Sequence, residues 1–325
     1  MPAAIVVLLG ILLILPTLTP MPAIQVTDPI CFEGMTDCVD ARLAAFWHRN
    51  DRHTISGQSG NALRLFGYPI GPARITAVNG IALLAQPFEQ VIVQQPLSNS
   101  DPSNIRLHTT GLERLQQLRR DPKLPATPPA TVPDGCRIFP ETGFAICNEF
   151  RNFWESNGLN LDNERGYTDT ERIALFGLPL SNISRETDGS GNRYLTQWFE
   201  RARLQIDSVT RQIIITPLGR AVTNNRPNPP PLPRNNGVIL SSATIPAGSA
   251  ITARGNGYTG DRWTQVTIVQ PDGSSMVAAE RISVSSAGVT ESYCCITPAN
   301  ALPGIWAIAF DGLDTGHHTI GFSGW

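Results

Sequence analysis

The sequence predicts a multi-domain fold in which two small α+β repeat units are followed by an all-β sandwich. Two proline-rich stretches, residues 121–135 and 224–237, divide the chain into three parts. The first two parts carry the same motifs in the same order, which indicates an internal duplication. The third part alternates β-rich runs with turns built from Gly, Pro and Asp, a pattern that is typical of all-β domains.

The two proline-rich stretches are predicted to be linkers. Segments with many prolines and few large apolar residues cannot bury a core and stay extended, so they act as semi-rigid spacers. The domains then cover residues 24–120, 136–223 and 238–325. A chain of 325 residues is long enough for each of these domains to have a core of its own.

The N-terminal segment, residues 1–23, has the features of a signal peptide. Its apolar run, residues 4–15, is too short to span a bilayer comfortably, and a proline-rich segment ends the run. We expect cleavage after Ala23 and a mature chain that is secreted or associated with the cell surface without spanning the membrane. An uncleaved membrane anchor is the alternative, since no Lys or Arg precedes the apolar run.

The six cysteines agree with export to an oxidising compartment. An even number of cysteines behind a signal peptide predicts disulfides. No CxxC spacing occurs and the histidines lie far from the cysteine pairs in the sequence, which argues against zinc. The adjacent last pair forms either a vicinal disulfide or two separate thiols. The three pairs are Cys31 with Cys38, Cys136 with Cys147, and Cys294 with Cys295.

Each repeat unit is expected to contain an amphipathic helix after its first cysteines. Four large apolar residues recur at i, i+4, i+7 and i+8, which places them on one helical face. A Trp closes the stripe in both units, and we expect both Trp side chains to be structural. The stripes are Val39, Leu43, Phe46 and Trp47 in the first unit and Ile146, Phe150, Phe153 and Trp154 in the second.

A seven-residue string follows each helix, LFGYPIG at residues 65–71 and LFGLPLS at residues 175–181. It is predicted to end a short second helix, such as residues 169–176, because Gly adopts the left-handed conformation that terminates helices and Pro then fixes an extended chain. A β-hairpin with its turn at residues 188–192 follows in the second unit, and its second strand is expected to run over residues 193–206. The β-rich runs that close the two units are residues 104–111 and 212–219.

The order of these motifs resembles the short repeats of bacterial secreted and cell-wall proteins, close to the LGFP type. The resemblance covers about residues 31–222, and the first copy is degenerate, with Asp51 in place of a Gly and Gly71 in place of a Ser. Such repeats are thought to attach proteins to the cell envelope, so the resemblance implies binding rather than catalysis. The matching residues of the second copy are Trp154, Asn157, Gly158, residues 176–181 and residues 197–200.

The third domain is predicted to be an immunoglobulin-like sandwich. About seven short β-rich runs follow one another between residues 238 and 325. A hairpin with Asp272 and Gly273 at its tip is the clearest of them. From Ile245 onward the turn residues are similar to those of bacterial immunoglobulin-like surface modules, which supports the fold and no particular ligand.

The composition and the motifs exclude several functions. A formal net charge of -2 leaves no excess of Lys and Arg to neutralise phosphates, so nucleic acid is not expected as a partner. The chain contains no nucleophile elbow, P-loop or dinucleotide fingerprint. His317 and His318 are neighbours on a predicted strand and point to opposite faces, so we expect no metal there and no cofactor elsewhere.

The candidates for ligand binding lie in or near the two repeated motifs. Aromatic rings there can stack on sugar faces. Glu200 is the best candidate for an acid, but no second carboxylate lies at a suitable position for glycoside hydrolysis. We therefore favour an ion pair between Glu200 and a neighbouring arginine. The candidate residues are Tyr68, Tyr194, Trp198, Glu200, Arg201 and Arg203.

These observations predict an exported, non-enzymatic protein that binds the cell envelope or an extracellular carbohydrate, with adhesion to a surface partner as the wider role. One alternative is a glycan- or peptidoglycan-hydrolysing enzyme that uses Glu200 as general acid. Another alternative is a structural spacer that displays the immunoglobulin-like domain.

Overall fold

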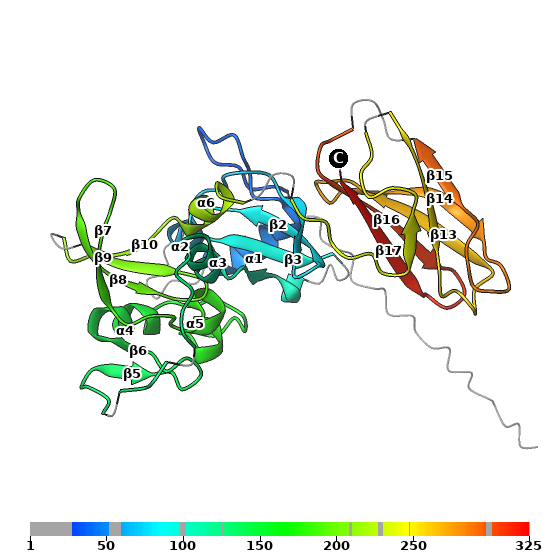
Figure 1. Cartoon of the computed structure of the whole chain (residues 1–325). Coiled ribbons are helices and arrows are strands. Elements are labelled where there is room, and N and C mark those ends of the chain that lie inside the picture. The colour runs from blue at the N-terminus through cyan, green and yellow to red at the C-terminus, as the bar shows by residue number, and fades with distance from the viewer. Residues whose placement is uncertain are drawn as a thin grey trace, which may run out of the picture.

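The computed structural model of the chain describes residues 28–51, 60–97, 102–124, 126–129, 131–207, 210–226, 230–246, 248–296 and 301–324. The predicted signal peptide lies outside these residues. None of the helices within them is long and apolar enough to cross a membrane. The described part of the chain is a multi-domain, β-rich protein with antiparallel sheets (Figure 1).

Unit 1, residues 28–120, consists of two helices, a four-stranded antiparallel sheet and a closing helix. The strands pair in chain order, β1-β2-β3-β4. The elements are α1 (Ala41–Asp51), α2 (Asn61–Phe66), β1 (Arg74–Val78), β2 (Ile81–Pro87), β3 (Ile92–Pro96), the short helix η1 (Pro102–Asn104), β4 (Arg106–Leu107) and α3 (Thr110–Gln117).

Unit 2, residues 131–223, has the same succession of two helices, four antiparallel strands and a closing helix after a two-stranded hairpin. The second helix spans the residues predicted for it and begins with a capping box formed by Thr168 and Glu171. The elements are β5 (Cys136–Ile138), β6 (Ala145–Cys147), α4 (Asn148–Glu155), α5 (Asp169–Phe176), β7 (Ser184–Thr187), β8 (Arg193–Trp198), β9 (Arg203–Asp207), β10 (Ile213–Ile215) and α6 (Leu218–Thr223).

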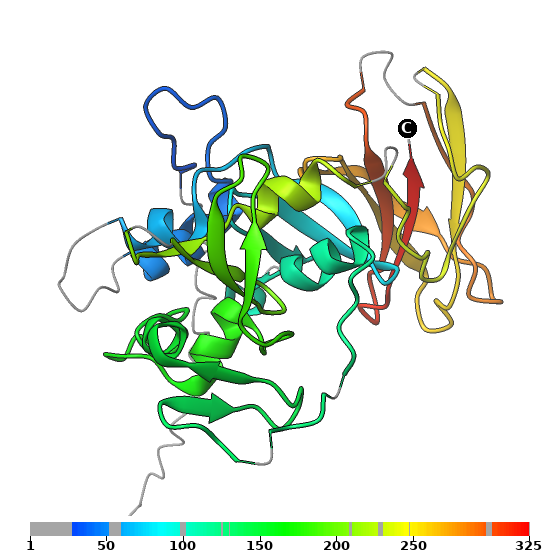
Figure 2. The same ribbon diagram turned by 60° about the vertical axis from the view of Figure 1, so that its left-hand side comes forward.

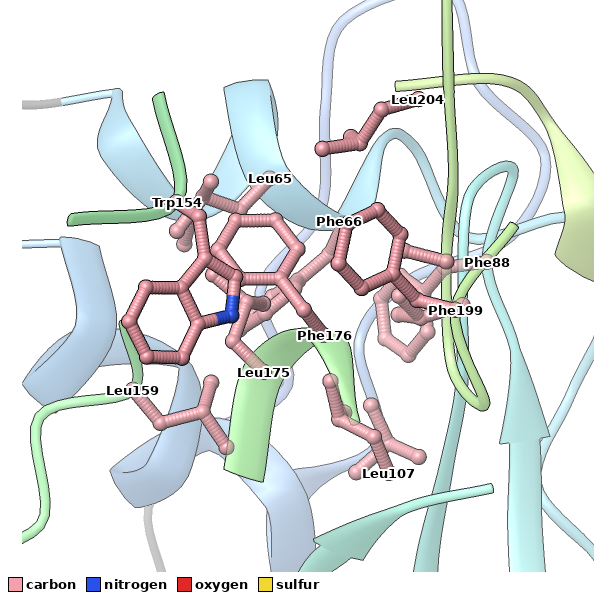
Figure 3. Close-up of a cluster of buried hydrophobic side chains, with 14 of the residues drawn as sticks. Leu65, Phe66, Phe88, Leu107, Trp154, Leu159, Leu175, Phe176, Phe199 and Leu204 are labelled. Carbon is pink, nitrogen blue, oxygen red and sulfur yellow. The ribbon is translucent and has the colours of Figure 1, made fainter. Parts of the chain in front are cut away.

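Units 1 and 2 share one hydrophobic core (Figure 3). Trp47 and Trp154 are both buried in it, as expected from the helical stripes. Phe66 and Phe88 of unit 1 lie in the same cluster as Phe176 of unit 2. Complete burial of a large apolar side chain contributes about 1.5–3 kcal/mol, so separation of the units exposes surface that both need to cover.

The closing helices interlock the two units (Figures 1 and 2). At the start of α3, Gly111 N and Leu112 N donate hydrogen bonds to the Glu200 carbonyl oxygen of unit 2, at 2.9 and 3.1 Å. At the start of α6, Gly219 N donates to the Gln90 carbonyl oxygen of unit 1 at 3.2 Å. Each helix therefore begins on a corner of the other unit, and α3 packs against α6.

Glycine permits the close approach at both of these corners. A Cβ atom at Gly111 would lie 1.9 Å from the Phe199 carbonyl oxygen. A Cβ atom at Gly219 would lie 2.1 Å from the Phe88 carbonyl oxygen. Both distances are far inside van der Waals contact, so a larger residue forces the helix away from the corner.

Unit 3, residues 238–324, contains a three-stranded and a four-stranded antiparallel sheet, in the orders β11-β12-β15 and β14-β13-β16-β17. Its core surrounds Tyr258, whose hydroxyl donates to the Phe310 carbonyl oxygen at 2.8 Å. Trp263 is 41% exposed and the Trp306 indole donates to a loop carbonyl, so neither occupies the core centre. The strands are β11 (Val238–Leu240), β12 (Ala250–Gly255), β13 (Trp263–Val269), β14 (Ser275–Ser283), β15 (Tyr293–Ile296), β16 (Ile305–Gly312) and β17 (His318–Gly324).

Unit 3 docks on unit 1, although unit 2 precedes it in the chain (Figure 1). Ile75 of β1 lies in one apolar cluster with Val269 and Phe322 of unit 3. The Ile75 amide donates to the Pro271 carbonyl oxygen at 2.8 Å. The predicted hairpin turn between β13 and β14 is therefore part of this contact.

The second proline-rich stretch lies against both neighbours instead of extending freely. Leu232 packs on the apolar cluster between units 1 and 3. Arg234 N donates to the Gly80 carbonyl oxygen at 2.9 Å, and Asn236 N donates to that of Ile320 at 2.8 Å. The described part of the stretch is held by this apolar contact and these main-chain bonds, and also by a hydrogen bond from Phe322 N to Asn235 Oδ1 at 2.8 Å and an ion pair between Arg226 and Glu113.

Two of the expected disulfides are present, namely Cys31–Cys38 and Cys136–Cys147. Each closes the entry loop of its unit and precedes the first helix. Cys294 in β15 carries a free, exposed thiol, so the expectation of a disulfide there is wrong. Adjacent side chains on a strand diverge, which explains the free thiol. The Cys295 side chain lies outside the described residues.

Three local predictions differ from the structure. The run of residues 193–206 is predicted to be one strand, but a corner at residues 199–202 divides it into β8 and β9. The β-rich runs that close the two units pass directly into the helices α3 and α6. The β-rich residues of these runs predict strands and do not indicate the helices. The stripe residues Val39 and Ile146 precede their helices, and both are still buried.

Candidate binding cleft in unit 2

The two repeated motifs meet at a helix-to-strand corner in each unit. In unit 2, Gly177 follows α5 with a φ angle of 75°. The Glu200 carboxylate accepts a hydrogen bond from Leu178 N at 3.1 Å. In unit 1 the Glu89 carboxylate accepts the same bond from Tyr68 N at 3.2 Å. The glutamates of both motifs therefore hold the chain that leaves the second helix.

The glutamine of the motif has a structural role as well. Gln197 Nε2 donates to the carbonyl oxygens of Ala145 and Ser181, at 2.7 and 3.0 Å. Gln86 makes the corresponding pair of bonds in unit 1. Both side chains are completely buried. They tie the entry loop of each unit to its corner.

Arg201 joins the corner of unit 2 to unit 1. Its Nη1 lies 3.5 Å from Glu200 Oε2, as expected for the ion pair. Its Nε donates to the Leu107 carbonyl oxygen at 3.2 Å, and Nη1 donates to that of Ile173 at 3.1 Å. Burial lowers the pKa of the Arg201 guanidinium from its ordinary value. These contacts place Arg201 and Glu200 in the framework of the protein.

The two tyrosine candidates lie apart from each other. The Tyr68 ring packs edge-to-face on Phe32, with 5.2 Å between the ring centroids. The Tyr194 hydroxyl donates to Asp188 Oδ2 at 3.3 Å beside the hairpin turn. Neither tyrosine lines the cleft that contains Trp198.

A cleft of about 590 Å³ lies between α3, α6 and β7. It brings together Trp198 and Arg203, two of the six candidate residues, with side chains from unit 1. Its charged groups carry an excess of positive charge, although the formal net charge of the chain is -2. They are Arg114 and Arg120 of unit 1 and Arg185, Glu186 and Arg203 of unit 2.

Trp198 forms the floor of the cleft, and only 2% of its surface is exposed. Its Nε1 donates to Glu186 Oε1 at 3.0 Å. The guanidinium carbons of Arg120 and Arg203 lie 5.7 and 4.9 Å from the ring centroid, which is the range of cation–π contacts. The cleft therefore presents guanidinium N–H groups to a ligand instead of a bare indole face.

Glu186 fixes these two arginines. It accepts hydrogen bonds from Arg120 Nη2 at 2.9 Å and from Arg203 Nη2 at 2.6 Å. Burial alone would raise the pKa of the Glu186 carboxyl, but hydrogen bonds from Trp198 and Arg120 and the charge of Arg203 hold it below its ordinary value. Glu186 is thus ionised at neutral pH and orients both guanidinium planes.

Sequence reasoning missed Glu186, Arg120 and Arg185. Arg120 follows the closing helix of unit 1, and no sequence pattern indicates that this helix crosses to unit 2. Only a local signal could have indicated one of these residues. Arg185 and Glu186 are neighbours on a predicted strand, so the side chain of one of them faces the covered side of the sheet.

A second cleft, of about 380 Å³, occupies the corresponding place in unit 1 beside β1 and α3. It contains Glu113, with Oε2 2.5 Å from His108 Nε2 and with hydrogen bonds from Arg226 Nε and Nη2 at 2.9 Å. Burial raises the pKa of Glu113, but the hydrogen bonds from His108 and Arg226 outweigh it and lower the pKa to about 2. This cleft holds one arginine against one carboxylate and has no excess charge.

The described residues contain no group of His, Cys, Asp and Glu side chains arranged to hold a metal ion. His318 Nδ1 lies 2.6 Å from Asp311 Oδ1. The His317 ring packs against the Tyr258 ring at 4.9 Å instead. The two histidines thus have separate partners.

No protein-family model matches the chain, and no curated protein sequence matches it.

Proposed function

We propose that the chain is an exported, non-catalytic protein that binds glycans of the cell envelope through the cleft of unit 2. In this proposal units 1 and 2 are two copies of one LGFP-like module. Unit 3 is an immunoglobulin-like domain that contributes to display or adhesion. The two disulfides support an oxidising, extracellular location.

The observation that carries the proposal is the cleft that contains Trp198 and Arg203. Its volume of about 590 Å³ lies within the range of ligand sites. Strands and two helices provide its lining, and Glu186 fixes two of its arginines, so its hydrogen-bond donors are oriented before a ligand arrives. Oriented N–H donors suit the many oxygen acceptors of a glycan.

The contacts of Glu200 support binding over hydrolysis. Retaining and inverting glycosidases use two carboxyl groups that flank the scissile bond, separated by about 5–10 Å. The Glu200 carboxylate instead accepts a main-chain hydrogen bond and pairs with Arg201. Glu89 has the same main-chain bond in unit 1 and an ion pair with Arg220 from α6 at 3.0 Å. Two equivalent glutamates with equivalent bonds indicate a framework role.

The test uses the mature chain, residues 24–325, because the units share a core. We expect it to sediment with purified bacterial cell walls and to bind glycans on an array. Absence of binding to both would overturn the proposal.

The hydrolase alternative is tested with labelled peptidoglycan. Glu200→Gln and its matched control Glu89→Gln are expected to lower the melting temperature alike, and no variant is expected to change the release of soluble fragments. Release by the wild-type chain that disappears only in Glu200→Gln would overturn the non-catalytic assignment.

A further inference from the structure

We propose that the cleft of unit 2 selects anionic glycans, and that its arginines bind carboxylate or phosphate groups along the polymer. This inference rests on the proposed function, because it names the class of glycan that the same cleft takes. The proposal is carried by the charge of the lining, by the free donors of the arginines and by the comparison with unit 1.

The lining of the cleft has an excess of positive charge, whereas the chain as a whole has a negative formal net charge. The lining contains four arginines, Arg114, Arg120, Arg185 and Arg203, and a single carboxylate, that of Glu186. The rest of the chain is weakly acidic, with a formal net charge of -2 for the whole. A cleft lined by one sign of charge focuses the field and raises the local concentration of ligands of opposite charge.

The arginines keep donors for a ligand after their internal bonds are counted. Arg120 and Arg203 each give Glu186 one hydrogen bond through Nη2, and a guanidinium has five N–H donors. The Arg120 side chain is 51% exposed. Arg203 Nε is buried and has no acceptor within the described residues. Planar guanidinium groups with free N–H pairs are suited to bidentate recognition of carboxylate and phosphate.

Arg185 and Arg120 are the exposed arginines of the lining. Arg185 lies on β7, at the edge of the sheet. Its guanidinium forms no ion pair within the described part of the chain. Arg185 alternates with Glu186 along β7, so its side chain lies on the other face of the sheet from Glu186 and Arg203 and borders the cleft only at the edge of the sheet.

Unit 1 provides an internal comparison at the same position. Ala85 and Thr196 each stand directly before the motif glutamine of their unit. Their cross-strand partners are Arg74 and Ser184, which therefore occupy equivalent positions. The next residues along these strands, Ile75 and Arg185, correspond as well. Ile75 is buried against unit 3, whereas Arg185 is exposed. The next strand residues, Thr76 and Glu186, line the two clefts, and the cleft of unit 1 contains one arginine, Arg226, so the shared fold does not require a cluster of arginines.

Titration calorimetry with matched polymers tests the charge preference. The probes are polygalacturonate with its methyl ester, and phosphomannan with phosphate-free mannan, at low ionic strength because salt screens such contacts. We expect the charged polymer of at least one pair to bind about tenfold or more tightly than its neutral partner. Tighter binding of polygalacturonate and tighter binding of phosphomannan both support the inference. Which of the two polymers is preferred shows whether the cleft binds carboxylate or phosphate groups.

Arg120→Ala is expected to weaken that binding roughly tenfold, and Arg120→Glu is expected to weaken it further. Arg254→Ala is the matched control, because Arg254 is also an exposed arginine and lies in unit 3. Equal affinity for charged and neutral polymers, or an unchanged affinity of Arg120→Ala, would overturn the inference. Cell-wall binding that survives such a result would leave the proposed function standing.

Discussion

Gly111→Ala tests the interlocking of the two units, because two physical effects predict opposite signs for it. Gly111 is the second residue of α3, and alanine in a helix is favoured over glycine by about 0.5–1 kcal/mol. The φ angle of Gly111 is not positive, so alanine introduces no local backbone strain. The opposing effect is the Phe199 carbonyl oxygen, 1.9 Å from the position of the new methyl group.

The close contact decides the sign. An ordinary contact to a methyl group is about 3.4 Å or more, so α3 has to move by roughly 1.5 Å. Overpacking of this kind costs about 1–3 kcal/mol. The displacement also weakens the hydrogen bonds from Gly111 N and Leu112 N to the Glu200 carbonyl oxygen, each of which contributes about 1 kcal/mol. After the gain in helix propensity is subtracted, a loss of about 2–4 kcal/mol remains.

Thermal unfolding of the mature chain measures this loss. For a protein body of this size we expect the melting temperature to fall by roughly 5–12 °C. Gly189→Ala is the control, since no atom lies within 4 Å of the Cβ position there and its φ angle is not positive. A melting temperature of Gly111→Ala equal to or above that of the wild type would refute the interlocking contact.

Two further predictions concern stability. The pKa of Glu113, about 2, lies below its unfolded value of about 4.3, so ionised Glu113 stabilises the fold above about pH 4.5 and this contribution is lost as the pH falls through 2. Glu113→Gln is expected to flatten the acid-unfolding curve, followed by circular dichroism, between about pH 4.5 and 2, whereas an unchanged slope would contradict this role. The Cys136–Cys147 disulfide joins residues separated by 11 positions, so replacement of both cysteines by serine is expected to lower the free energy of unfolding by about 2–3 kcal/mol in urea titrations. A loss below about 0.5 kcal/mol would show that the entry loop is held by its other contacts.

Local order was predictable from the sequence wherever short-range chemistry determines it. The helix at residues 169–176 follows from its capping box and the Gly-Pro corner behind it, and its bounds were predicted correctly. The buried Trp47 and Trp154 follow from the helical spacing of the apolar residues. The two disulfides of the entry loops follow from the pairing of cysteines along the chain.

The cleft could not be predicted, because it depends on where a helix of one unit meets the other. Arg120 reaches Trp198 only because Gly111 lets α3 approach the corner of unit 2. Trp198 and Arg203 were among the predicted candidates, and the structure places both in the cleft. Glu200 and Arg201 stand beside them in the sequence but point into the corner, since the chain reverses direction between β8 and β9.

The Trp198 indole signal provides the most direct test of the binding cleft. The chain has 6 Trp residues, so a ¹H–¹⁵N spectrum of the mature protein contains few indole signals, and Trp198→Phe identifies the one from Trp198. On titration with the anionic polymer that binds most tightly, we predict that the Trp198 Nε1–H signal shifts first, because its partner Glu186 also holds Arg120 and Arg203. Shifts confined to Trp263 and Trp306 of unit 3 would contradict a ligand site in unit 2.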